Sequence, residues 1–288
     1  MNELALFAGA GGGILGGHLL GWRTVCAVEW EAYPASVLVA RQNDKILPTF
    51  PIWDDVQTFD GKPWRGIVDI VSGGFPCQDI SAAGNGVGIT GARSSMWGHM
   101  ARIIGEVRPR YAFVENSPML TTRGLGTVFR DLATMGYDAE WGVLGAADVG
   151  AKHLRERIWI VGYTKLYGYV AAINQQVISR KPNWSQTNIE QLERSSISKI
   201  SNSKCRRLEK QGKYEQFINT TQSGDWQTSF PEYGSSSDFW TTEPNVGRVA
   251  NGVAARVDRL KAIGNGQVPL CAATAWNILK GRIDDKSK

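Results

Sequence analysis

The sequence predicts an α/β fold organised around a doubly wound sheet, and three observations support that prediction. Residues 4–7 form a short apolar run that is followed by a glycine-rich turn and a helical pattern. Further apolar runs alternate with amphipathic segments as far as about residue 163. Charged and nucleophilic side chains fall where these runs end, and in a doubly wound sheet the carboxyl ends of the strands meet at a ligand crevice.

Composition and charge describe an ordinary globular chain. Its 288 residues leave room for one large domain or for a large and a small one. The hydrophobic content of 42% and the charged content of 20% are those of an ordinary globular protein. The net charge of +5 is a mild bias toward a polyanionic partner. The cysteines have no C-x-x-C spacing and the histidines no i,i+4 pair, so we expect neither a disulfide framework nor a metal. We also expect no signal peptide and no membrane span, and the cysteine usage suits the reducing cytoplasm.

The first strand and turn are typical of a nucleotide-binding unit. After residues 4–7, the glycines at 9–17 allow a ligand to approach the backbone, and a helix is expected to begin near residue 14. Alone, this match to the dinucleotide pattern is weak. The second apolar run, 24–28, ends in Glu29, which could accept hydrogen bonds from both hydroxyls of a ribose, and Trp30 could lie against a purine. The alternative for Glu29 is an ordinary charge at a strand end.

The third and fourth segments bring further polar groups to the same edge. After a helical pattern at 34–42, Asp55 is expected in a loop or strand end, facing an adenine amino group. A buried strand at 67–72 then leads through two glycines and a proline to Cys77. Nucleophilic cysteines occupy such partly exposed sites, whereas most free cysteines are small buried apolar residues, and this motif alone does not decide between the two.

The next segments complete the predicted sheet. Residues 82–95 are rich in Gly and Ser and form a long loop of the kind that closes over ligands, and a helix is expected at 96–106. A strand at 111–114 ends in Glu115, which could face the same ligand as Cys77. A helix is expected at 126–135, and two strands at 142–149 and 158–163 flank a basic segment that contains Arg155 and Arg157.

The chain changes character after residue 163, which divides it into 1–163, 164–246 and 247–288. In the middle part periodicity fades, and between Lys199 and Lys213 six basic residues stand against one acid. Such a stretch suits a nucleic-acid surface or, equally, a solvated insertion. The last part contains the turn 262–269 and an apolar helix at 270–279, which we expect to pack on the first domain.

These motifs, in this order, resemble those of the DNA (cytosine-5) methyltransferase family of prokaryotic or phage type. The resemblance covers nearly the whole chain outside 164–246. Six motifs carry it: Phe7-Ala8-Gly9-Ala10-Gly11-Gly12 with Glu29-Trp30, Asp55-Val56, Pro76-Cys77-Gln78, Glu115-Asn116-Ser117, His153-Leu154-Arg155-Glu156-Arg157, and Gly264-Asn265-Gly266-Gln267-Val268-Pro269. Two positions depart from the family pattern, since Ser117 stands for a valine and His153 for a glutamine.

The resemblance implies a Rossmann-like S-adenosylmethionine-dependent methyltransferase sheet with a smaller, irregular target-recognition domain at 164–246. It implies S-adenosylmethionine as cofactor without a metal, double-stranded DNA as partner, a cytoplasmic monomer, and a cognate restriction endonuclease in restriction–modification systems. The implied catalytic residues are Cys77, Glu115, Arg155 and Arg157. The implied cofactor-binding residues are Phe7, Ala8, Gly9, Gly11, Gly12, Glu29, Trp30, Asp55, Val56, Pro76 and Asn265.

In the chemistry that the resemblance implies, the Cys77 thiolate adds to carbon 6 of a flipped-out cytosine, so that carbon 5 can take the methyl group. Glu115 relieves charge at ring nitrogen 3, and Arg157, with Arg155 near it, stabilises charge at the 2-oxo group. Three other readings remain: an RNA cytosine methyltransferase, an inactive nucleic-acid-binding protein, and an NAD-dependent dehydrogenase. The last is disfavoured because that chemistry does not need Pro76-Cys77-Gln78.

Overall fold

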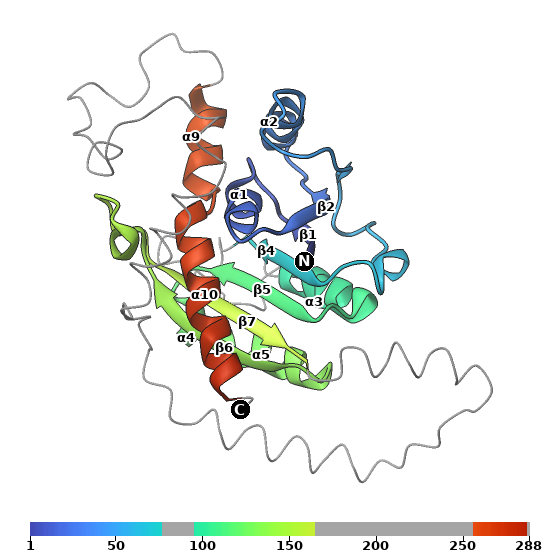
Figure 1. Cartoon of the computed structure of the whole chain (residues 1–288), viewed down its shortest axis with the longest axis vertical. Coiled ribbons are helices and arrows are strands. Elements are labelled where there is room, and N and C mark those ends of the chain that lie inside the picture. The colour runs from blue at the N-terminus through green and yellow to red at the C-terminus, as the bar shows by residue number, and fades with distance from the viewer. Residues whose placement is uncertain (77–94, 165–255, 287–288) are drawn as a thin grey trace.

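The computed structural model describes residues 1–76, 95–164 and 256–286, which form one sheet with helices on both faces (Figure 1). The strands are β1 (Asn2–Leu6), β2 (Arg23–Val28), β3 (Ile52–Trp53), β4 (Ile70–Gly74), β5 (Tyr111–Asn116), β6 (Asp138–Leu144) and β7 (Arg157–Tyr163). The helices are α1 (Gly12–Leu19), α2 (Ala32–Asn43), α3 (Ser95–Val107), α4 (Leu120–Arg123), α5 (Leu125–Thr134), α9 (Arg256–Asn265) and α10 (Pro269–Asp285). Within these ranges no helix has both the length and the apolar character needed to span a bilayer.

The sheet is doubly wound, as the sequence predicts. Its strand order is β3-β2-β1-β4-β5-β7-β6, with β1 to β5 parallel and β7 antiparallel to both of its neighbours. The direction of winding reverses between β1 and β4, which lie side by side. Ligands of open α/β sheets bind at such a switch point, outside the carboxyl ends of the strands. The turn after β1 and the segment after β4 therefore meet at one crevice.

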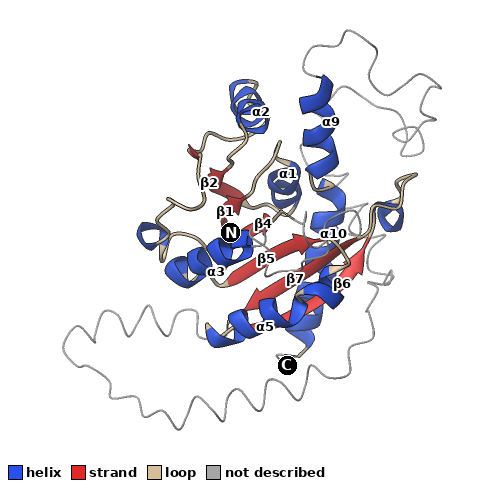
Figure 2. Ribbon diagram, turned by 180° about the vertical axis from the view of Figure 1, so that it is seen from behind, coloured by secondary structure: helices blue, strands red, loops and turns tan. Residues whose placement is uncertain are grey.

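Alternating side chains of the central strands build a core on each face. On β5, Ala112 and Val114 join the cluster that contains residues of α3 and α5, whereas Tyr111 and Phe113 join the cluster around Trp276 of α10. Figures 1 and 2 show α10 across one face of the sheet and α3 with α5 across the other. The prediction that the last helix packs on the first part of the chain is thus confirmed. Because β-strand side chains alternate, Glu115 lies on the α10 face.

Most predicted elements are present, and one strand is misplaced. The predicted strand 142–149 is β6, which ends at Leu144, and Ala146–Val149 form a 3-10 helix instead. The Asp148 side chain accepts a hydrogen bond from the Gly145 N–H (2.8 Å), and Gly150 has φ +95°, so the backbone turns where an apolar run suggested a strand. The helix α9 was not predicted. The expected loop 82–95, apart from Ser95, which begins α3, and the expected domain 164–246, apart from Thr164, lie outside the described residues.

Candidate active site

The turn after β1 is tied to the end of β2 through Glu29. One carboxylate oxygen of Glu29 accepts a hydrogen bond from the Gly9 N–H (2.6 Å) and the other accepts one from the Glu31 N–H (2.8 Å). Gly9 has φ +55°, and Phe7 has φ +52°, which is rare for a residue with a side chain and typical of functional sites. Burial raises the pKa of Glu29, against these two hydrogen bonds. Each carboxylate oxygen keeps a second lone pair, so Glu29 can still accept hydrogen bonds from a ligand.

A pocket of about 370 Å³ opens beside this turn and unites most of the predicted site residues. That size suits a small-molecule cofactor. The lining includes ten of the residues that the sequence singled out: Phe7, Gly9, Glu29, Trp30, Asp55, Val56, Pro76, Glu115, Arg157 and Asn265. Trp30 is 73% exposed, so its ring is free to cover a flat ligand. Ala8 lines a smaller adjoining cavity, whereas Gly11, Gly12 and Arg155 line neither of the two, and Cys77 lies outside the described residues.

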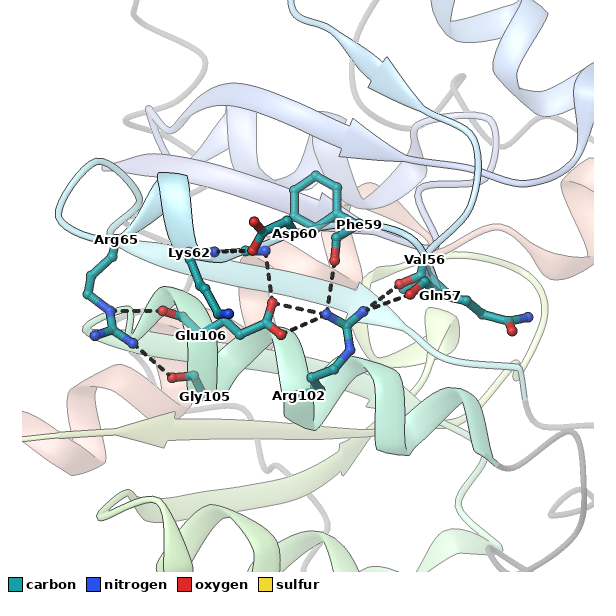
Figure 3. Close-up of polar contacts among 10 residues, drawn as sticks. Val56, Gln57, Phe59, Asp60, Lys62, Arg65, Arg102, Gly105 and Glu106 are labelled. Carbon is teal, nitrogen blue, oxygen red and sulfur yellow. Dashed lines mark hydrogen bonds and ion pairs between the residues drawn. The ribbon is translucent and has the colours of Figure 1, made fainter.

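Arg102 of α3 fixes the loop that carries Asp55 and Val56 (Figure 3). Its guanidinium donates hydrogen bonds to the carbonyl oxygens of Val56 (2.8 Å) and Phe59 (2.9 Å). It also pairs with Glu106 (2.8 Å), whose carboxylate accepts the Gly61 N–H (2.8 Å). Short loops without sheet partners satisfy their carbonyls in this way. Sequence reasoning missed Arg102, because its position in an amphipathic helix looks like that of any surface arginine.

Glu115 and Arg157 form an ion pair at the inner end of the pocket. The Arg157 Nε lies 2.8 Å from one carboxylate oxygen of Glu115, which is only 8% exposed. Burial raises the pKa of Glu115, and the positive charges of Arg157 and Arg155 oppose that rise. A carboxyl group held in this way can carry a proton nearer to neutral pH than an exposed one. The two residues come from neighbouring antiparallel strands, β5 and β7.

Asn116, next to Glu115, joins the ends of two strands. Its side-chain amide donates a hydrogen bond to the Phe75 carbonyl oxygen (3.0 Å), and its own oxygen accepts the Ser117 N–H (2.8 Å). Phe75 directly precedes Pro76, so Asn116 fixes the backbone that leads into the Cys77 motif. The departure at Ser117 leaves this arrangement intact, because Ser117 contributes its backbone N–H.

Arg155 lies at a different place from Arg157. Its guanidinium donates hydrogen bonds to the carbonyl oxygens of Gly264 and Gly266, both at 2.6 Å. Arg155 therefore fixes the end of α9 and the turn that follows it, and so holds Asn265 at the pocket. Lys261 of α9 forms an exposed ion pair (2.7 Å) with Glu31, which lines the pocket.

No metal centre emerges from the geometry, since in the described ranges no three His, Cys, Asp or Glu side chains are grouped so that they could hold an ion. The cysteines described are two buried thiols. Burial raises the pKa of Cys26 to about 11 and that of Cys271 to about 12, which keeps both protonated at neutral pH.

Comparisons with known proteins identify a family and several relatives of this chain. Residues 1–270 match the family described as C-5 cytosine-specific DNA methylase. The type II methyltransferase M.NgoBI of Neisseria gonorrhoeae is 34% identical over 57% of this chain and 50% of its own length, and M.HaeII of Haemophilus aegyptius is 33% identical over 56% and 50%. The chain thus spans about half the length of these curated relatives. A solved putative DNA modification methyltransferase of an E. coli prophage aligns with a TM-score of 0.47 over 58% of this chain and 47% of its own, at 24% identity.

The family match extends over nearly the whole chain and includes every motif that lines the pocket. The matched residues include the glycine turn after β1 and the end of β5 at Glu115, which lie on the two sides of the crevice. The chain therefore belongs to the C-5 cytosine-specific DNA methylase family.

Proposed function

We propose that this chain transfers a methyl group from S-adenosylmethionine to carbon 5 of a cytosine flipped out of double-stranded DNA, through a covalent adduct on Cys77. One observation carries the proposal. A single pocket contains the groups suited to an adenosine cofactor, Glu29 and Trp30, and the groups suited to a pyrimidine ring, Glu115 and Arg157. A cofactor and a base held there would lie next to each other.

The described residues fit the cofactor. The Glu29 carboxylate, fixed by two backbone N–H groups, can accept hydrogen bonds from the two ribose hydroxyls. The exposed ring of Trp30 can stack on adenine, and the loop held by Arg102 supplies Asp55 and Val56 on another wall. When bound, S-adenosylmethionine supplies an electrophilic methyl group on a sulfonium. No metal is needed to activate it.

We assign the nucleophile to Cys77. Pro76 lines the pocket, and Cys77 is the next residue in the chain. The buried thiols of Cys26 and Cys271 are unsuited, because a thiolate is required. The Cys77 thiolate adds to carbon 6 of cytosine, and carbon 5 then forms the bond to the methyl group. Loss of the carbon 5 proton expels the sulfur and restores the ring.

Glu115 and Arg157 act on the ring while it carries extra electron density. Because burial raises its pKa, Glu115 can hold a proton and share it with ring nitrogen 3. Arg157 orients that carboxyl group through its 2.8 Å contact and offers its remaining N–H groups to the 2-oxo group of the base. Arg155 is bound to the loop carbonyls, so we assign it the support of this site rather than contact with the base.

DNA is the proposed substrate, and residues 164–246 are the proposed recognition region. A base inside the duplex cannot reach an enclosed pocket, so the target cytosine must be flipped out. The basic stretch between Lys199 and Lys213 suits phosphate contacts. The relatives M.NgoBI and M.HaeII are type II methyltransferases, which supports a role beside a cognate restriction endonuclease in the bacterial or phage-infected cytoplasm.

The test uses tritiated S-adenosylmethionine with PCR-amplified genomic DNA, which carries no methylation at any sequence, and with tRNA. We expect label in DNA from the wild type and from Cys26→Ala, a matched control at a buried thiol, and none from Cys77→Ser. A DNA duplex containing 5-fluorocytosine should trap a covalent adduct on Cys77, since fluorine at carbon 5 blocks release. Label only in tRNA, or an active Cys77→Ser variant, would refute the proposal.

A further inference from the structure

Gln267 occupies a space between the glycine turn and the sheet that only glycines leave open. A Cβ atom at Gly12 would lie 2.2 Å from the backbone carbonyl oxygen of Gln267. A Cβ atom at Gly13 would lie 2.5 Å from its side-chain Oε1. Both distances are far below van der Waals contact, so the first turn of α1 is shaped to receive Gln267. Gly12 therefore serves packing against this residue rather than the pocket lining.

The side-chain amide of Gln267 reaches Glu115. Its Nε2 donates a hydrogen bond to the Glu115 Oε2 (3.4 Å), while the Glu115 Oε1 forms an ion pair with the Arg157 Nε (2.8 Å). The contact depends on Gly74 of β4, where a Cβ atom would lie 2.3 Å from Glu115 Oε2 and 3.0 Å from Gln267 Nε2. Thus the two carboxylate oxygens of Glu115 are held separately, one by a cation and one by a neutral amide.

The loop that carries Gln267 is itself fixed on both sides. Arg155 donates hydrogen bonds to the carbonyl oxygens of Gly264, at the end of α9, and of Gly266, immediately before Gln267. Two residues later α10 begins at Pro269, and it packs across the sheet (Figure 1). A long side chain from an anchored loop has little freedom, so it can orient the group that it touches.

We propose that Gln267 is a positioning residue for methyl transfer, which holds the Glu115 carboxyl group toward the base and links it to the glycine turn of the cofactor pocket. The inference rests on the proposed function, because it assigns to Glu115 the contact with ring nitrogen 3. It explains why three glycines from two separate segments, Gly12, Gly13 and Gly74, surround one residue.

The contact with Gln267 also affects the pKa of Glu115. The charged and titratable groups that act on Glu115 or feel its charge are Arg157, Arg155 and Cys271, and the first two favour the ionised carboxylate. The amide of Gln267 also favours the ionised form, since it donates to Glu115. Without that amide the pKa of Glu115 rises, and a reaction that needs its proton persists to higher pH.

The experiment compares Gln267→Met, which keeps the length of the side chain without the amide, with Gln42→Met. Gln42 is a matched control, because it is half-buried, its amide oxygen accepts one backbone N–H, and it lies outside the pocket. Single-turnover methyl transfer to PCR-amplified genomic DNA is measured from pH 6 to 9, and the Kd for S-adenosylhomocysteine by calorimetry. For Gln267→Met we expect a roughly tenfold lower rate, which corresponds to the loss of one hydrogen bond to a charged group. The Kd for S-adenosylhomocysteine should be unchanged, and the fall of the rate at alkaline pH should occur at higher pH than in the wild type. Gln42→Met should match the wild type.

A second measurement does not depend on activity. In protein with 13C-labelled glutamate carboxyl groups, the resonance that disappears in Glu115→Gln identifies Glu115, and its titration should move to higher pH in Gln267→Met. An unchanged titration, or an equal loss of rate and of S-adenosylhomocysteine binding, would overturn the inference while the wild type remained active. A wild type inactive on DNA would instead refute the proposed function, and with it the role assigned to Gln267.

Discussion

Replacing Glu3 by Gln should stabilise the protein at neutral and alkaline pH. Glu3 lies in β1 with 0% exposure, and no cation among the described residues pairs with it. Its two carboxylate oxygens accept hydrogen bonds from the hydroxyl groups of Ser72 (2.6 Å) and Thr24 (2.7 Å), on the strands to either side. Gln keeps the shape of the side chain and one of these contacts, and the other hydroxyl group can turn to accept from its amide.

The magnitude follows from the pKa. Burial raises the pKa of Glu3 from 4.5 to about 7, because two hydrogen bonds do not offset the loss of hydration. As the pH rises through this window, the unfolded chain releases the proton before the folded protein does. The free energy of unfolding therefore falls between the two values and levels off above about pH 7. The full loss is roughly 3 kcal/mol, since one pH unit between two pKa values corresponds to about 1.4 kcal/mol.

Urea denaturation at several pH values between 4.5 and 8.5 measures this effect. The difference in unfolding free energy between Glu3→Gln and wild type should grow with pH by roughly 3 kcal/mol and then stay constant. Glu140→Gln is the control, because Glu140 is similarly buried but is paired with Lys286, so its loss should not stabilise the protein. If the free energies of unfolding of wild type and Glu3→Gln changed with pH in parallel, the reasoning would be refuted.

Three further predictions concern the pocket and the residues that support it. Glu29→Gln should weaken binding of S-adenosylhomocysteine about 30-fold by calorimetry, because one acceptor for the ribose becomes a donor that faces a backbone N–H. Gly12→Ala should lower the free energy of unfolding by about 2 kcal/mol in urea, since its Cβ atom would meet the carbonyl oxygen of Gln267. Arg102→Met should raise the KM for S-adenosylmethionine about tenfold at nearly unchanged kcat, because the loop beside the cofactor loses its support, whereas Arg41→Met, at an exposed ion pair with Asp44, should not.

Each of these predictions has a contradicting result. Unchanged S-adenosylhomocysteine binding in Glu29→Gln would show that the carboxylate serves only the backbone. A fully stable Gly12→Ala would mean that the loop at Gln267 moves aside at no cost. A fall in kcat without a change in KM for Arg102→Met would place its effect on catalysis rather than on the cofactor wall.

Several parts of the fold and site could be predicted from local pattern. Apolar runs located most of the strands, although not β3 (Ile52–Trp53). Glu29 and Glu115 were expected at strand ends, and Asp55 in a loop or strand end, where the pocket lies. The error at 142–149 has a local cause, because an apolar run does not reveal that Asp148 and Gly150 turn the backbone. The helix α9 was missed, since six of its ten residues are charged, Gly or Asn.

Other assignments needed contacts between distant positions. Arg155 and Arg157 look equivalent in the sequence, but one contacts the loop at Gly264 and the other contacts Glu115. Gly12 belongs to a cofactor motif in the sequence, yet its missing side chain makes room for Gln267. Arg102 gave no signal, because arginines occur throughout protein surfaces. Gln267 was noted only as a member of the motif 264–269, and its contact with Glu115 was not predicted.

The sequence by itself determined which reactive groups the chain carries, their order, and that strand ends would present them. Only the tertiary structure decided which of these groups touch one another. The physical reason is that apolar periodicity and glycine turns act over a few residues, so they are legible locally. Pairings such as Gln267 with Glu115, which are 152 positions apart, depend on the strand order, the register and the packing of α10 across the sheet.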